Sequence, residues 1–77
     1  MNNIKVYTTS TCPWCVKAKN YLKSNGISFE EINVALDQDA AREMVQKSGQ
    51  MGVPVLDING KIVVGFDKKR IDGILGL

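Results

Sequence analysis

Residues 4–15 read IKVYTTSTCPWC, and this stretch decides the fold that we expect for the chain. Ile4–Thr8 is typical of a β-strand, and a helical pattern begins at Pro13, a residue suited to the first helical position. Cys12 therefore stands at the start of a helix, where unpaired backbone N–H groups and the positive end of the helix dipole favour a thiolate. Because the thiolate is the form of cysteine that attacks disulfides, the stretch predicts a redox-active dithiol.

The chain has two cysteines, and both lie in this motif. We expect Cys12 to be the nucleophile, with the N–H groups of Trp14 and Cys15 directed at its sulfur. Pro13 has no N–H and keeps the turn stiff. Cys15 is expected to be more buried and to act as the resolving thiol. A C-x-x-C disulfide closes a ring too small to add much stability, which argues against a structural bridge. Two inert core cysteines, or half of a zinc site made by dimerisation, are the alternatives.

Length and composition limit the other classes of protein. The chain has 77 residues, 44% of them hydrophobic, and a net charge of +2. These values predict one small globular domain over residues 1–77 and give no argument for nucleic-acid binding. No apolar run is long enough for a bilayer, and Met1-Asn2-Asn3 is too short for a signal peptide. Two cysteines in one motif favour the reducing cytoplasm, and we expect a monomer.

The chain has no histidine. This absence excludes Cys-His nucleophilic catalysis, a Ser-His-Asp arrangement and imidazole metal ligation within one chain. We expect no resident metal and no bound cofactor.

Helix and strand patterns alternate along the rest of the chain. We expect a first helix over residues 13–25 and a strand over residues 27–34. The inner face of the first helix would hold Cys15, Ala18 and Leu22. Asp37 can cap a second helix that runs to about Ser48. Its inner face would hold Ala41, Met44, Val45 and Ser48.

A hairpin and a short helix complete the chain. Asn59-Gly60, between apolar runs at 55–58 and 61–64, is a strong β-hairpin signal. Asp67 can cap a last helix. Its inward residues would be Ile71, Ile74 and Leu75. The order β-α-β-α-β-β-α predicts an α/β domain with a four-stranded mixed sheet: the first two strands parallel, the last two antiparallel, and helices on both faces.

Two more motifs could form a binding groove. Pro54 either has a cis bond that leaves the backbone of Val53 free to pair with an extended peptide, or is a trans strand starter. Gly65 permits a positive φ, and the N–H groups of Phe66 and Asp67 could then hold a carboxylate. The Asp67 side chain could accept from an ammonium. A helix cap beside a core phenylalanine is the alternative for this second motif.

Trp14 is forced outward by its place between the two cysteines. It either lines a groove for a partner or packs against the last helix. Residues 68–70 read Lys-Lys-Arg, which is unfavourable at the positive end of a helix. These side chains form either a solvated face or a basic rim that attracts an anionic ligand.

Together, Cys12-Pro13-Trp14-Cys15, Val53-Pro54 and Gly65-Phe66-Asp67 resemble the motifs of a bacterial glutaredoxin, over essentially the whole chain. The resemblance implies a minimal thioredoxin fold with Pro54 in cis. It also implies glutathione-dependent reduction of protein disulfides and of glutathione mixed disulfides. Glutathione would be a co-substrate bound between Trp14, Val53 and the Gly65-Phe66-Asp67 turn. Val53 would pair with its cysteinyl backbone, and Phe66 and Asp67 would hold its γ-glutamyl end.

Two residues depart from the family pattern. Thr9 stands where many glutaredoxins have a basic residue, and Gly52 replaces the usual threonine before Val-Pro; both changes remove contacts to glutathione. Residues 64–71 also resemble the redoxins that feed ribonucleotide reductase and are recharged by thioredoxin reductase, although Asp67 is not typical of those. That activity is the alternative among enzymes. An alternative of another class is a dimeric zinc or iron–sulfur module, which the stiff Pro13 turn disfavours.

Overall fold

The computed structural model describes residues 3–77. Met1 and Asn2, which belong to the segment judged too short for a signal peptide, lie outside the described residues. Within the described chain the elements follow the predicted β-α-β-α-β-β-α order. They are β1 (Ile4–Thr8), α1 (Pro13–Ser24), β2 (Glu30–Asn33), α2 (Gln38–Ser48), β3 (Val55–Ile58), β4 (Lys61–Val64) and α3 (Lys68–Leu75). Among these residues there is no helix with the length and apolar character needed to cross a membrane.

The strands form one mixed sheet in the order β2-β1-β3-β4. β1 runs parallel to β2, in a register that pairs Lys5 with Glu30 and Thr8 with Asn33. β3 pairs antiparallel with both β1 and β4. The predicted mixed sheet is confirmed, although β2 is shorter than the expected strand over residues 27–34. The N–H of Ile27 bonds to the carbonyl of Leu22 at the end of α1, so the chain enters the sheet only after this turn.

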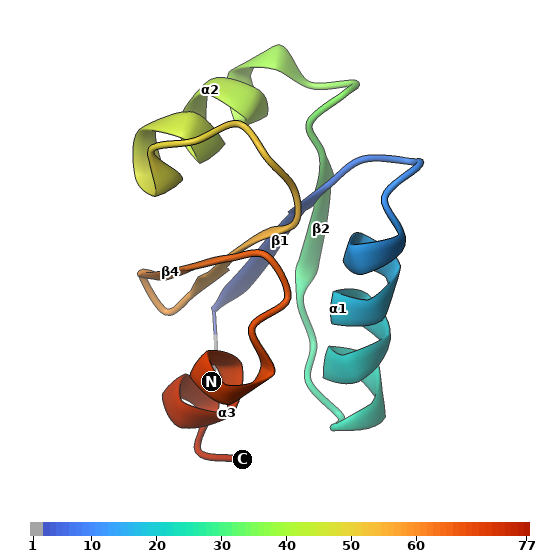
Figure 1. The fold of residues 1–77 in the computed structure, drawn as a ribbon, viewed down its shortest axis with the longest axis vertical. Helices are drawn as coiled ribbons and strands as arrows, with labels where there is room; N and C mark the ends of the chain where they lie inside the picture. The colour runs from blue at the N-terminus through green and yellow to red at the C-terminus, as the bar shows by residue number, and fades with distance from the viewer. Residues whose placement is uncertain (1–2) are drawn as a thin grey trace.

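Helices cover both faces of the sheet, with α1 and α3 on one face and α2 on the other (Figure 1). Side chains alternate along each strand, so β1 and β3 send residues to both cores. The core under α1 and α3 contains Ile4, Val6, Ala18, Leu22, Leu56, Ile58, Val63 and Ile71. The core under α2 contains Tyr7, Ala40, Met44 and Val55.

The inner face of α2 differs from the predicted one by one residue. Ala40 is buried with Met44, one turn apart, whereas Ala41 is only partly buried. Val45 is partly buried against the same core, and Ser48 turns its hydroxyl back to the carbonyl of Met44 at 2.7 Å. The cap at Asp37 is confirmed, because its carboxylate accepts from the N–H of Ala40 at 3.0 Å.

The hairpin between β3 and β4 has the predicted turn. Asn59 and Gly60 both have a positive φ, of 54° and 89°. Two successive residues with positive φ match the twist of an antiparallel hairpin, which explains why asparagine and glycine stand here. This turn fixes the register of β3 on β4 and so places residues 64–67 at the end of the sheet that carries the cysteines.

Ile71 is the fully buried residue of α3, and it anchors the helix on the sheet. We expect Ile71→Ala to lower the free energy of unfolding by about 2–5 kcal/mol, because the change removes apolar contacts and leaves a cavity. Ile74→Ala, a matched change at a partly buried position, should cost clearly less. Urea unfolding followed by circular dichroism measures both. Equal losses would show that Ile71 is not the anchor.

Candidate active site

Cys12 is the N-cap residue of α1, with an extended backbone at φ −100° and ψ 108°. Its Sγ accepts a hydrogen bond from the N–H of Cys15 at 3.2 Å, which is one of the two donors expected from the sequence. The same Sγ lies 3.7 Å from the carbonyl oxygen of Val53, to which the thiol can donate. The sulfur is therefore placed between a helix start and the segment before Pro54, and it remains partly exposed.

Cys15 lies on the inner face of α1 with Ala18 and Leu22, and it is completely buried. Both cysteines are free thiols in this structure. Burial, assisted by a hydrogen bond with Cys12, raises the pKa of Cys15 to about 11. The two thiols are therefore unequal: a reagent can reach Cys12, whereas Cys15 is shielded and holds its proton.

The raised pKa of Cys15 predicts a loss of stability at alkaline pH. The folded pKa, about 11, lies above the ordinary value of 9.0, so the folded state binds the proton more tightly. The resulting stabilisation is full below pH 9 and disappears as the pH rises through 11. We expect the reduced protein to lose roughly 2 kcal/mol in this window from Cys15 alone.

Urea unfolding under reducing conditions at pH 8 to 11 would measure this loss. Tyrosines and lysines titrate in the same range, so the Cys15→Ala variant is the reference. The difference in stability between the two proteins should shrink as the pH rises. A constant difference would contradict the assignment.

A groove opens beside Cys12. Its volume is about 270 Å³, and it is lined by Trp14, Val53, Pro54, Gly65 and Phe66. The Val53–Pro54 bond is cis, as the resemblance implied, and Gly65 has a φ of 77°. The N–H of Gly65 donates to the carbonyl of Pro54 at 2.8 Å and so joins the two walls of the groove. Three segments far apart in the sequence thus meet at the dithiol.

The aromatic residues of the groove differ in their packing. Trp14 is 56% exposed, and the ammonium of Lys17 lies 4.4 Å from its ring centre. It therefore lines the groove and is not buried under the last helix. Phe66 packs against the core, where its ring meets that of Tyr21 edge-on at 5.6 Å. Phe66 thus belongs both to the core and to the groove. The binding-turn interpretation and the core-phenylalanine interpretation therefore each describe only part of its position.

Asp67 is not among the residues that line the groove. Its carboxylate accepts from the N–H of Arg70 at 3.2 Å and so caps α3, as the helix-cap interpretation predicts. The cations after it are partly engaged within the protein. Lys68 pairs with Asp72 at 2.9 Å, and the guanidinium of Arg70 donates to the carbonyl of Ile62 at 3.2 Å.

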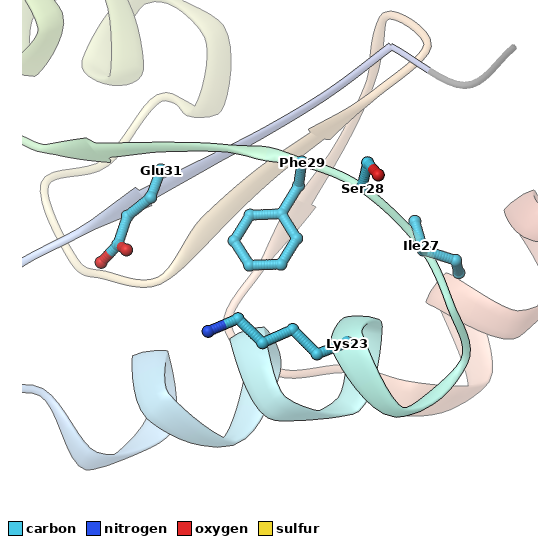
Figure 2. A pocket seen from close by; sticks show the side chains of 5 residues that line it. All are labelled: Lys23, Ile27, Ser28, Phe29 and Glu31. Atoms are coloured by element: carbon cyan, nitrogen blue, oxygen red, sulfur yellow. The ribbon is translucent and has the colours of Figure 1, made fainter.

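A second cavity, of about 390 Å³, lies where α1, β2 and the segment between them meet (Figure 2). It is lined by Lys23, Ile27, Ser28, Phe29 and Glu31. Lys23 is eight residues beyond Cys15, which is about 12 Å along the helix, whereas Glu31 reaches the middle of α1 through its bond to Lys19. The cavity contains no thiol, and the groove beside Cys12 is the better candidate site. Residues 3–77 also contain no group of three side chains that could hold a metal ion.

The structure gives a reason for one of the two departures from the family pattern. The side-chain amide of Gln50 accepts from the N–H of Gly52 at 2.6 Å and donates to its carbonyl at 2.9 Å. A Cβ at position 52 would lie 2.7 Å from the Gln50 Oε1. A glycine at position 52 therefore leaves room for the Gln50 side chain to fold back onto the backbone. We did not predict this role of Gln50, because no local pattern marks an amide that folds back on the chain two residues later.

The comparisons with known proteins agree with this geometry. The family model named Glutaredoxin matches residues 4–63. The chain belongs to the glutaredoxin family. An uncharacterized glutaredoxin-like 8.6 kDa protein in the rubredoxin operon of Clostridium pasteurianum is 53% identical over 72 residues, which cover 94% of this chain and 96% of that protein. Glutaredoxin 3 of Escherichia coli K12 is 37% identical over 67 residues, 87% of this glutaredoxin and 81% of the relative.

Solved structures show the same fold. A mutant of the thioredoxin-like protein BC3987 superposes with a TM-score of 0.91 and 32% identity, covering 99% of this glutaredoxin and 97% of that chain. NrdH-redoxin of Escherichia coli, a glutaredoxin-like protein with a thioredoxin-like activity profile, superposes with a TM-score of 0.80 and 29% identity, covering 97% and 93%. The predicted thioredoxin fold is confirmed, and the family implies a thiol–disulfide redox protein.

Proposed function

We propose that this glutaredoxin uses glutathione to reduce protein disulfides and glutathione mixed disulfides. The observation that supports the proposal best is the position of Cys12. Its sulfur is partly exposed at a helix start, accepts a backbone N–H at 3.2 Å, and adjoins the groove that contains the cis Val53–Pro54 bond. The N–H bond and the helix dipole both stabilise negative charge on this sulfur.

In the proposed reaction the Cys12 thiolate attacks one sulfur of a disulfide. A Cys12–substrate disulfide forms, the substrate disulfide breaks, and the second sulfur leaves as a thiolate with the electron pair. For a protein substrate, Cys15 then attacks Cys12 and releases the reduced protein. Two glutathione molecules restore the dithiol in two further exchanges. For a glutathione mixed disulfide, a second glutathione can attack Cys12 directly.

The groove supports glutathione as the ligand. Trp14 and Phe66 provide apolar walls, and the backbone of Val53 lies beside the Cys12 sulfur, where the cysteinyl part of glutathione would pair. The N–H groups at the start of α3 are near the proposed place of the γ-glutamyl carboxylate. Asp67 would have to serve this end of the ligand in addition to its role as a cap.

A second candidate function is that of a redoxin recharged by thioredoxin reductase, which donates electrons to ribonucleotide reductase. The likeness to NrdH-redoxin favours it, and so do the two departures at Thr9 and Gly52. Glutaredoxins have reduction potentials of about −200 to −230 mV and thioredoxin one of about −270 mV, so the reduction potential would help to separate the two functions. In either case we place the protein in the reducing cytoplasm, with disulfide-containing or glutathionylated proteins as partners.

Reduction of a glutathione mixed disulfide coupled to NADPH tests the proposal. One assay contains glutathione and glutathione reductase, and the other contains thioredoxin reductase. We expect turnover in the first assay only. Turnover through thioredoxin reductase alone would reject the glutathione proposal in favour of the second candidate.

Position 9 gives a sharper version of this test. We expect Thr9→Lys to lower the KM for the mixed disulfide by about twofold to fivefold, because a cation there can pair with a ligand carboxylate. The turnover number should stay the same. Thr11→Lys, which adds the same charge at a nearby exposed position, is the control. Equal effects of both variants would mean that the charge attracts the ligand only in a general way.

A further inference from the structure

A lysine is fixed one helical turn beyond Cys15. The Nζ of Lys19 lies 2.7 Å from the Oε2 of Glu31 on β2, and its side chain is only 20% exposed. The same Oε2 accepts from the hydroxyl of Thr8, a buried residue of β1, at 3.3 Å. Figure 2 shows the carboxylate of Glu31 directed toward α1. This network holds an ammonium group against the protein between the helix and the sheet.

Lys19 and Cys15 are on the same side of α1. Residues four apart on a helix are neighbours on its surface. Three groups act on the charge of the buried Cys15: the Cys12 thiol, the backbone N–H of Thr9 and the Lys19 ammonium. Burial raises the pKa of Cys15 most and the Cys12 thiol adds to this rise, while the Thr9 N–H and, more weakly, the Lys19 ammonium act in the opposite direction. Glu31 faces the same region from β2, and its bond to Lys19 keeps its own pKa below the ordinary value.

We propose that Lys19 is a positioning residue for the second exchange, because its fixed ammonium stabilises the negative charge that Cys15 needs in order to attack Cys12. The proposal rests on the proposed roles of the two cysteines. In this step Cys15 gives its proton to water, the Cys15–Cys12 bond forms, and the Cys12–substrate bond breaks. The substrate sulfur leaves with the electron pair as a thiolate.

A purely structural role explains the network less well. An ion pair between partly exposed side chains contributes little to folding. The bond from Lys19 is the main reason why the pKa of Glu31 is lowered, and Lys23, one turn further along α1, contributes only a small part. Lys19 also lies close enough to Cys15 to act on the charge of its sulfur, in the direction that favours the thiolate.

Reaction with 5,5′-dithiobis(2-nitrobenzoate) separates the two exchanges. The attack by Cys12 releases one coloured thionitrobenzoate anion and leaves the other bound to Cys12 in a mixed disulfide. The attack by Cys15 releases the second anion and forms the Cys12–Cys15 disulfide. Stopped-flow absorbance between pH 6 and 9 therefore gives a first phase for Cys12 and a second phase for Cys15.

A charge series at position 19 tests the proposal. We expect Lys19→Arg to keep the rate of the second phase, Lys19→Met to slow it about threefold, and Lys19→Glu to slow it about tenfold. The factor is smaller than the change in thiolate fraction, because a thiolate of higher pKa is also more nucleophilic. The first phase should not change in any of these variants. In the matched control Lys23→Met, both phases should keep their rates.

Two results would overturn the proposal. The second phase could be insensitive to the charge at position 19, or both phases could slow together, as a loosened helix would cause. Variants of the two cysteines test separately whether the proposed roles of Cys12 and Cys15 are wrong. If they are wrong, Cys12→Ser would keep the first phase or Cys15→Ser would keep the second phase. Neither result depends on the Lys19 variants.

Discussion

Cys12→Ser is expected to abolish the reduction of both protein disulfides and glutathione mixed disulfides. A serine hydroxyl is not ionised at neutral pH, and residues 3–77 offer no histidine base to activate it. Cys15 cannot take over, because it is completely buried and its pKa is raised to about 11. We expect a loss of at least about a thousandfold in turnover, as is usual when a nucleophile is removed.

The coupled NADPH assay with each substrate measures this loss. Thermal unfolding of the variant is the control, because serine keeps the N-cap of α1 and should leave the fold intact. Retained turnover in a folded variant would show that Cys12 is not the nucleophile.

Cys15→Ser is expected to separate the two substrates. A mixed disulfide between Cys12 and glutathione can be attacked by a second glutathione, so turnover of glutathione mixed disulfides should remain. A Cys12–protein disulfide, in contrast, loses its intramolecular attacking group. Intramolecular attack is so much faster than attack from solution that protein-disulfide reduction should fall by at least about a hundredfold.

Parallel assays with a protein disulfide and a glutathione mixed disulfide measure this separation. Mass spectrometry should find the variant trapped as a Cys12–protein disulfide. Full activity of Cys15→Ser on the protein substrate would contradict the assignment of Cys15 as the resolving thiol.

Much of the fold could be predicted because short-range rules control it. The Asn59-Gly60 turn, the caps at Asp37 and Asp67, and the buried face of α1 all follow from local patterns. The start of β2 could not be predicted in this way. Ile27 uses its N–H to close the end of α1, and the pairing of β1 with β2 begins only at Glu30.

In the candidate site, too, some features follow from local patterns and others depend on distant parts of the chain. Local patterns indicated Cys12, Cys15 and an outward Trp14. The cis form of Pro54 was one of two equal alternatives from the local sequence, and the family resemblance decided it. The contact of Lys19 with Glu31 could not be predicted, because it joins side chains twelve positions apart on different elements. It depends on the register of the sheet and on the position of α1 over it.

The folded side chain of Gln50 has a consequence for selectivity. Its amide meets the N–H and the carbonyl of Gly52 as a neighbouring strand would, so an incoming extended chain finds that position taken. Val53, directly before Pro54, is the neighbouring residue that we expect to pair with such a chain. Backbone hydrogen bonds to a single residue give almost no selectivity for the sequence of a partner. For the reductant proposed above, we expect this closed loop to favour recognition of the disulfide over recognition of the protein around it.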